Sequence, residues 1–363
     1  YLTENEIGIR LRATQQNPSV LPTESLYAIE HDTMDTTFRS MYQGLYAYLS
    51  ARKERRDLLL SQRPPRFDKS LDSMIFCSED DFTRVALKAK AAQDYFLLIG
   101  PPGTGKTSCA LKKMVETFHA DKDAQILLLS YTNRAVDEIC KSLASIAPAV
   151  DFIRVGSELS CDEAYRGHLI ENELSSCNRR SEVYERIRNC RIIVGTVAAI
   201  SGKPELFRLK HFDVAGEDEK DAIDKFVLIG DHKQLPAVVQ QNAEQAAIYD
   251  ESLLSIGLSN LKDSLFERLY RNCTAACSSS AIHRSYDMLC RQGRMHPEVA
   301  LFANRAFYGG RLIPVGLPHQ IEDSDTICRL AFYPSVPEKA GASAKINYSE
   351  ARIVADLAVR IYE

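Results

Sequence analysis

The stretch YFLLIGPPGTGKTSCALKKMV, Tyr95 to Val115, decides the fold class. It opens with a compact apolar run, Tyr95–Ile99, and after a glycine-rich turn its apolar residues recur at helical spacing. The turn, Gly100 to Thr107, satisfies the pattern GxxxxGK[ST]. Such a turn lets successive backbone N–H groups and the positive N-terminus of a helix surround phosphate oxygens. The stretch therefore predicts a phosphate-binding loop between a strand and a helix.

Two residues of this loop have roles set by the chemistry of nucleoside triphosphates. The Lys106 ammonium group can reach the β and γ phosphates, and the Thr107 hydroxyl can ligate magnesium. We therefore expect ATP and Mg²⁺ as cofactors. The loop residues expected to contact the nucleotide are Gly100, Pro101, Pro102, Gly103, Thr104, Gly105, Lys106, Thr107 and Ser108.

Strand and helix candidates alternate after residue 80. Short apolar runs at Ile126–Leu129, Ile192–Val194, Phe212–Ala215 and Phe226–Ile229 suit buried strands, and amphipathic helical patterns lie between several of them. Strands that alternate with helices predict an α/β fold with a mostly parallel sheet and helices on both faces.

The bulk composition is that of an ordinary globular protein. The 363-residue chain is 45% hydrophobic and 26% charged, with a formal charge of -4. This charge argues against a uniformly basic surface that binds nucleic acid, but it allows a local cationic groove. No apolar run approaches the roughly 20 residues that span a bilayer, so no membrane association is expected.

The ten cysteines include no CxxC pair. Free thiols in a reducing cytoplasm are the favoured interpretation, since no secretory signal follows Tyr1. A zinc cluster of Cys273, Cys277, His283 and Cys290 is the alternative, although its spacing fits no standard pattern. A start at Tyr1 instead of Met leads us to expect a piece of a longer protein.

The N-terminal region predicts a helix followed by a basic stretch. From Thr36 onward, apolar residues recur at helical spacing as far as Leu49. Pro64 and Pro65 should end any helix in the basic stretch, residues 52–69. The stretch is either a solvated face or a stalk that contacts phosphates.

Four further motifs follow the phosphate loop in order: SYTNRAVD from Ser130, VGT from Val194, GDHKQLP from Gly230 and RQGRMHP from Arg291. With GPPGTGKT they resemble superfamily 1 helicases, specifically the Upf-like group that moves 5′ to 3′ on single strands. The resemblance covers about Asp94 to Leu312. It implies a helical accessory segment (1–75), a P-loop NTPase (RecA-like) ATP-binding domain (76–272) and part of a second RecA-like domain (273–363).

The resemblance also implies roles for individual residues. The residues that would contact the nucleic-acid backbone are Thr132, Asn133 and Thr196. Asp231 and Gln234 would couple the γ phosphate to the nucleic-acid groove. Arg294 would reach that phosphate from the second domain. Gln292 would contact the nucleotide. The structural alternatives are helix caps for Thr132 and Asn133, a turn for Asp231 and a surface ion pair for Arg294.

The implied activity is an ATP-dependent helicase or translocase acting on single-stranded DNA or RNA. The alternatives are a nucleotide-gated nucleic-acid-binding module without unwinding activity and an AAA+-type remodelling ATPase. The GDHKQLP and RQGRMHP motifs argue against the last of these. Sequence alone does not separate DNA from RNA, because contacts to the 2′-OH depend on geometry.

The sequence departs from the family at several places. Phe82 stands where relatives usually carry a glutamine that reads adenine, and Gly293 stands where an aromatic residue is usual. The last two helicase motifs do not occur before Glu363. We therefore expect the 363-residue chain to bind nucleotide but to hydrolyse it poorly.

The acidic pair that would bind magnesium and activate water is hard to place. Taken literally, HFDVAGEDEKDAIDKF offers Asp218 and Glu219. However, Gly216 and Glu217 would then fill buried strand positions, and too few residues would remain for a parallel crossover of ~10 to 12 residues. The alternative is that a segment carrying the pair is missing between Ala215 and Gly216.

Overall fold

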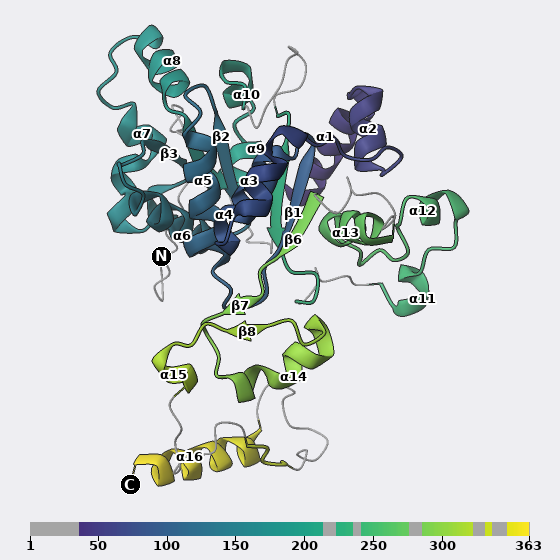
Figure 1. Ribbon diagram of the computed structural model, residues 1–363. Coiled ribbons are helices and arrows are strands. Elements are labelled where there is room, and N and C mark those ends of the chain that lie inside the picture. The colour runs from purple at the N-terminus through teal and green to yellow at the C-terminus, as the bar shows by residue number, and fades with distance from the viewer. Residues whose placement is uncertain are drawn as a thin grey trace, which may run out of the picture. The chain divides into compact units, whose positions relative to one another are not determined.

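The computed structural model describes residues 36–212, 223–234, 241–275, 285–321, 331–335 and 347–362 (Figure 1). The chain divides into two compact units, one ending at Ser50 and the other starting at Ala51. In the first unit the described element is helix α1 (Thr36–Ser50), which confirms the helix predicted there.

The second unit alternates strands and helices as predicted. Its strands are β1 (Tyr95–Ile99), β2 (Ile126–Ser130), β3 (Phe152–Val155), β4 (Ile192–Thr196), β5 (Phe226–Gly230), β6 (Tyr286–Met288), β7 (Arg291–Gln292) and β8 (Ile313–Pro314). Its helices are α2 (Lys53–Leu59), α3 (Asp72–Cys77), α4 (Asp81–Ala91), α5 (Lys112–His119), α6 (Asn133–Ala144), α7 (Ile170–Glu173), α8 (Arg180–Asn189), α9 (Val197–Ser201), α10 (Glu205–Leu209), α11 (Ala243–Ala246), α12 (Glu251–Ser255), α13 (Leu265–Ala275), α14 (Pro297–Tyr308), α15 (Pro318–Ile321) and α16 (Tyr348–Tyr362).

The strand before the phosphate loop is the centre of a parallel sheet with the order β5-β1-β6. Strand β1 pairs in parallel with β5, with Tyr95 opposite Phe226, and with β6 on its other side. All five residues of β1 are buried, which explains its unbroken apolar sequence. Residues 286–288 thus share a sheet with β1, whereas the domain division implied by the resemblance begins a second domain at residue 273.

A second parallel sheet has the order β2-β4-β3. Strand β4 is its centre, and it pairs over its full length with β2, from Ile126 opposite Ile192 to Ser130 opposite Thr196. The parallel strands and their flanking helices confirm the predicted α/β class. Two separate three-stranded sheets were not predicted.

Helices cover these sheets and close the core (Figure 1). Helix α4 packs on β1 and α5, while α6 packs on β2 and β4. One apolar cluster joins α4 and β1 to Met114 of α5. A second joins α6, β2 and β4 to Val115 of the same helix. Helix α5, directly after the phosphate loop, therefore contributes to the cores beneath both sheets.

The basic stretch before α3 has a structural role that neither sequence interpretation foresaw. Arg63 and Arg66 donate hydrogen bonds to the fully buried carboxylate of Asp94, at 2.9 and 3.0 Å. Helix α2 ends at Leu59, before Pro64 and Pro65, as predicted. At least two cations of this stretch therefore pin the segment to the start of β1.

The cysteines of the described chain are all unpaired thiols. Within the same residues, His, Cys, Asp and Glu side chains form no group of three or more that could hold a metal ion. Cys277 and His283 of the zinc alternative lie outside the described residues. None of the helices searched in the described chain is long and apolar enough to cross a membrane.

Candidate nucleotide-binding site

The phosphate loop leaves the carboxyl end of β1 and is held by hydrogen bonds to β5 and within the loop. The Gly100 N–H donates to the Gly230 carbonyl at 2.8 Å, and the Thr104 hydroxyl donates to the Pro101 carbonyl at 2.8 Å. Gly103 has φ +77°, and a Cβ there would lie 2.5 Å from Cβ of Arg294. Glycine is therefore required at Gly103 both by its backbone angle and by a close neighbour.

Lys106 lies at the start of the π-helical turn Lys106–Leu111, which leads into α5. Its ammonium group donates a hydrogen bond to the Gly100 carbonyl. Burial lowers the pKa of Lys106. The nearby Asp231 carboxylate raises this pKa, and the Arg294 guanidinium lowers it. A bound anion would favour the charged form, so this lysine is suited to meet a phosphate.

A cavity of about 600 Å³ lies around this loop. Residues 101–108 line it together with Arg134, Glu138, Gln234, Gly293 and Arg294. Its volume falls within the range of about 300–1,000 Å³ usual for small-molecule sites. The structure thus brings Gln234 and Arg294 to the loop, although they are far from it in sequence.

Arg294 is positioned by the buried side chain of Gln292. The Gln292 Oε1 atom accepts hydrogen bonds from the backbone N–H groups of Arg294 and Met295, at 3.1 and 2.9 Å. The Gly293 N–H donates to the Gly103 carbonyl at 2.9 Å and ties this turn to the phosphate loop. Gln292 is only 1% exposed and does not line the cavity. Its direct contact with nucleotide stays a prediction.

Asp231 lies directly after β5 and forms a small network. Its carboxylate accepts hydrogen bonds from Nε2 of Gln234 at 3.0 Å and from the hydroxyl of Tyr308 at 2.7 Å. Burial raises the pKa of Tyr308, and the hydrogen bond to Asp231 raises it further. Sequence reasoning missed Tyr308, because it ends an ordinary amphipathic helix, α14, and nothing in its spacing marks it.

The residues predicted to contact nucleic acid lie at the carboxyl ends of β2 and β4. The Thr132 hydroxyl accepts from the Ala135 N–H at 3.3 Å and caps α6, while the Thr196 hydroxyl caps α9 at 3.1 Å. Thr196 is 9% exposed, and Asn133, the first residue of α6, is half-buried. Tyr131 beside them is 91% exposed. The caps are structural, and nucleic-acid contact stays a prediction for all three residues.

Three candidate residues remain, namely Phe82, Asp218 and Glu219. Phe82 packs against the apolar cluster of α4 and β1, and its ring lies 3.5 Å from where a Cβ of Gly105 would be. It therefore adjoins the loop, as its position in the sequence suggested. Asp218 and Glu219 lie outside the described residues.

A Mg²⁺ ion bound with nucleotide needs few protein ligands. It usually keeps several waters and takes one or two protein oxygens in addition to phosphate oxygens. Thr107 lies on the cavity wall, half-buried, and its carbonyl accepts a hydrogen bond from the Ser142 hydroxyl at 3.1 Å. Thr107 is therefore a suitable single ligand, and the described residues do not by themselves form a complete metal site.

Comparisons with known proteins show what this chain is similar to. Residues 78–190 match the AAA domain family. The DNA replication ATP-dependent helicase/nuclease DNA2 of Homo sapiens is 28% identical over 330 residues, covering 82% of this chain and 28% of the relative. JHS1 of Arabidopsis thaliana, which has the same descriptive name, is 30% identical over 333 residues, covering 84% of this chain and 22% of the relative. The DNA2 protein of Saccharomyces cerevisiae is 26% identical over 240 residues, with shares of 60% and 15%.

This chain spans less than a third of the length of each of these relatives. The match to the AAA domain family includes the phosphate loop, and the similarity to the human relative covers 82% of this chain. These similarities confirm the predicted resemblance of the chain to the Upf-like group of superfamily 1 helicases.

Proposed function

We propose that this chain is the ATP-binding part of a motor that moves along single-stranded DNA and separates strands. The observation that carries the proposal is the cavity in which the phosphate loop meets Gln234 and Arg294. A motor needs this arrangement, because it must couple the phosphates to segments that move relative to the loop. DNA is favoured over RNA because the curated relatives are named as DNA replication helicase/nucleases.

The side chains in the cavity suit phosphoryl transfer. The Lys106 ammonium would hold the β and γ phosphates, and the exposed Arg294 guanidinium would neutralise charge that develops on the γ phosphate. Bound Mg²⁺, with Thr107 as one ligand, would neutralise the phosphate oxygens further. Gln292 would keep Arg294 in place through the backbone of its turn.

The network at Asp231 supplies a route from the phosphates to the segment after β6. Asp231 contacts Gln234, which lines the cavity, and Tyr308, which ends α14. A change at the γ phosphate that moves Gln234 would therefore be transmitted to α14. The exposed ring of Tyr131 suits stacking on a base next to Thr132 and Asn133, without sequence preference.

A nucleotide-gated binding module is the second candidate function. The observation that favours it is that Glu138 is the single acidic residue lining the cavity around the loop, among the described residues. Hydrolysis requires a residue that orients water, whereas gating requires only that nucleotide binds and shifts the network.

Replacement of Lys106 by Ala separates these two functions. The change is made in the longer protein of which we propose this chain is a part, called the parent protein below. If the motor proposal is right, Lys106→Ala abolishes strand displacement and DNA-stimulated ATP hydrolysis. The matched control is Lys113→Ala, because Lys113 lies on α5 and pairs with Glu116 instead of lining the cavity. Strand displacement at an unchanged rate by Lys106→Ala contradicts the motor. A parent protein that binds DNA in a nucleotide-dependent way but displaces no strand supports the gated module.

The domain division and the compartment also stay proposals. We retain an accessory segment, an ATP-binding domain and part of a second domain, and we assign β6 to the ATP-binding domain because it pairs with β1. The free thiols suit a reducing compartment such as the cytoplasm. The names of the relatives instead favour a compartment that holds DNA.

A further inference from the structure

Arg134 is a cationic side chain beside the phosphate loop that has no role assigned so far. It lines the cavity of about 600 Å³ together with Lys106, Arg294 and the acidic Glu138. Among the described residues, three cations and one carboxylate therefore face this cavity. Lys106 belongs to the loop and Arg294 to the turn after β7, whereas Arg134 comes from a third element, α6.

The contacts of α6 fix which of its faces is turned to the loop. Val136, Ile139 and Leu143 are buried in the apolar cluster that α6 shares with β2 and β4. Asp137, on another face, pairs with the buried guanidinium of Arg154 in β3, at 2.6 Å. Rotation of α6 about its axis would break a buried ion pair and expose apolar side chains, so its orientation is set.

The face that carries Arg134 lies against the phosphate loop. On this face the Ser142 hydroxyl donates a hydrogen bond to the Thr107 carbonyl at 3.1 Å. Positions 134, 138 and 142 follow the spacing i, i+4 and i+8, so their side chains lie along one face of the helix. Arg134 and Glu138 consequently project from this face toward the cavity, which both of them line.

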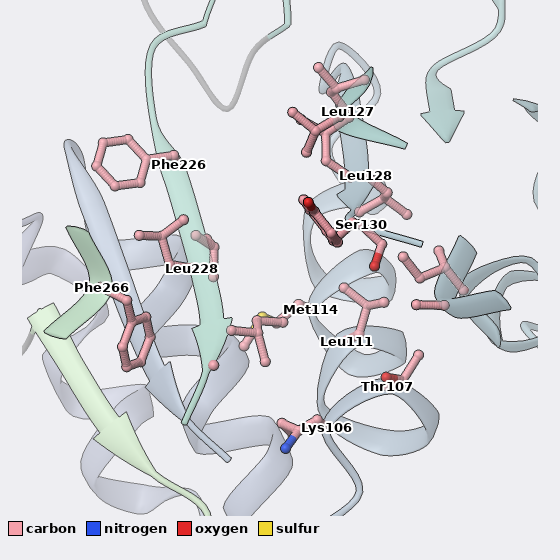
Figure 2. A pocket seen from close by; sticks show the side chains of 18 of the residues that line it. Lys106, Thr107, Leu111, Met114, Leu127, Leu128, Ser130, Phe226, Leu228 and Phe266 are labelled. Carbon is pink, nitrogen blue, oxygen red and sulfur yellow. The ribbon is translucent and has the colours of Figure 1, made fainter. Parts of the chain in front are cut away.

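A second cavity gives independent evidence that α6 begins beside the loop. It has a volume of about 750 Å³, and its lining includes Thr107 as well as Ser130 and Ala135. Figure 2 shows Thr107 and Ser130 on the side of this cavity opposite Leu228. Ser130 ends β2 and Ala135 lies in the first turn of α6. The chain between them, which includes Arg134, therefore passes close to the loop.

The Arg134 guanidinium is available to an anion. It is exposed, and among the described residues it makes no hydrogen bond or ion pair. Arginine presents several N–H donors in a planar fork, which matches the oxygens of a phosphate group. A solvated surface arginine would also be exposed, but it would not line the cavity of a phosphate loop. The position of Arg134 therefore favours a phosphate ligand.

The terminal phosphate is the one that suits Arg134. In a loop of this pattern the backbone N–H groups surround the α and β phosphates, and the lysine reaches the β and γ phosphates. The γ phosphate is thus the one least enclosed by the loop itself. Among the described residues, Arg134, Gln234 and Arg294 line the cavity from outside the loop with side chains that donate hydrogen bonds.

We propose that Arg134 binds the γ phosphate and links it to the residues predicted to contact DNA. Thr132 and Asn133 directly precede Arg134, so a force of the phosphate on Arg134 acts on the start of α6, where these residues lie. Because coupling between two ligands is reciprocal, triphosphate and DNA would change each other's affinity by the same factor. The inference deepens the proposed function and rests on it for the nucleotide and the DNA.

Nucleotide titration of the 363-residue chain tests the phosphate contact. A fluorescent, non-hydrolysable ATP analogue and the matching ADP analogue are titrated in the presence of Mg²⁺. We expect Arg134→Ala to weaken binding of the ATP analogue at least about tenfold and of the ADP analogue less than about twofold. Arg134→Lys should recover part of the affinity, because it keeps the charge but not the fork. The matched control is Lys141→Ala, an exposed cation of α6 that does not line the cavity.

The outcomes of this titration separate the role of Arg134 from the proposed function. Equal binding of the ATP analogue by wild type and Arg134→Ala overturns the proposal, and so does an equal loss for the two analogues. Lys106→Ala is measured alongside. If it also binds as wild type does, nucleotide does not occupy the loop, and the proposed function fails too. If Lys106→Ala alone weakens binding, only the role of Arg134 is wrong.

DNA binding by the parent protein tests the link. Wild type and Arg134→Ala are titrated with fluorescent single-stranded DNA, with and without the ATP analogue. We expect equal DNA affinities without nucleotide, and a change of affinity on addition of the analogue that wild type shows and Arg134→Ala loses. A lower affinity of Arg134→Ala without nucleotide would show that Arg134 contacts the DNA backbone instead, which overturns the link. A wild type whose DNA affinity does not respond to the analogue overturns it as well.

Discussion

The hydroxyl of Tyr308 donates a hydrogen bond of 2.7 Å to the carboxylate of Asp231. It joins the last residue of α14 to the carboxyl end of β5, next to the phosphate loop. Asp231 also accepts from Gln234, so one carboxylate connects the cavity with a segment that begins after β6. This contact gives the proposed coupling a physical basis.

Replacement of Tyr308 by Phe should weaken the fold and uncouple nucleotide from DNA. A hydrogen bond to a charged group contributes about 1.5–3 kcal/mol, so the free energy of unfolding should fall by about that amount. Urea unfolding measures this change. The control is Tyr249→Phe, because Tyr249 is 80% exposed, and its change should stay within about 0.5 kcal/mol. In the parent protein, DNA should stimulate ATP hydrolysis less in Tyr308→Phe, and full stimulation would show that the contact is only structural.

Gln292 should act through Arg294 and not by holding nucleotide. In the parent protein, Gln292→Ala removes the acceptor for the N–H groups of Arg294 and Met295. We expect kcat to fall at least tenfold, toward the value of Arg294→Ala, while the KM for ATP changes less than threefold. Steady-state kinetics measures both. Gln292→Glu keeps an acceptor and should recover part of the rate. A large rise in KM with kcat unchanged would instead indicate direct contact with nucleotide.

Lys225 should make stability depend on pH in the alkaline range. Burial lowers the pKa of Lys225 to about 8, and its ammonium donates to the carbonyls of Ala89 and Lys90. Because the folded state releases this proton more readily than the unfolded state, stability should rise between pH 8 and about 10.5, by about 3 kcal/mol at most. Urea unfolding at pH 7.5 and 10 measures this rise. The variant Lys225→Met should lose it and should be the more stable protein at pH 7.5. An unchanged pH dependence in Lys225→Met would contradict the assignment.

Asp94 should make stability depend on pH in the acid range. Burial alone would raise the pKa of Asp94, but hydrogen bonds from Arg63 and Arg66 outweigh it and lower the pKa to about 2. The stabilisation from this carboxylate is complete above the unfolded pKa, near 4, and is lost as the pH falls toward 2. We therefore expect wild type to lose about 1.5 kcal/mol more than Asp94→Asn between pH 4.5 and pH 2.5. Equal losses in the two proteins would show that Asp94 is not ionised in the fold.

The sequence predicts local elements well and distant contacts poorly, for physical reasons. Strand β1, the loop and the start of α5 are consecutive, so glycine spacing and apolar periodicity define them. The approach of Arg294 to Gly103 depends on tertiary packing, and the expectation that Arg294 reaches the γ phosphate came from the resemblance and stays a prediction. The bond between Tyr308 and Asp231 has no local signature. Gln292 was assigned to the nucleotide by resemblance, whereas its burial and its backbone partners depend on how residues 290–321 fold.

The acidic pair shows the other limit of sequence reasoning. Asp218 and Glu219 lie outside the described residues, so the literal assignment stays untested. The alternative, a segment missing between Ala215 and Gly216, rests on the spacing of the chain and also stays a prediction.

Titration of the 363-residue chain with a fluorescent ATP analogue in the presence of Mg²⁺ tests the central claim most directly. The claim is that nucleotide binds between the phosphate loop and Arg294. Wild type should bind with a micromolar Kd, and Lys106→Ala should weaken binding at least thirtyfold, while Lys113→Ala should bind as wild type does. Unlabelled ATP should displace the analogue. Binding that is equally tight in wild type and Lys106→Ala would contradict the account.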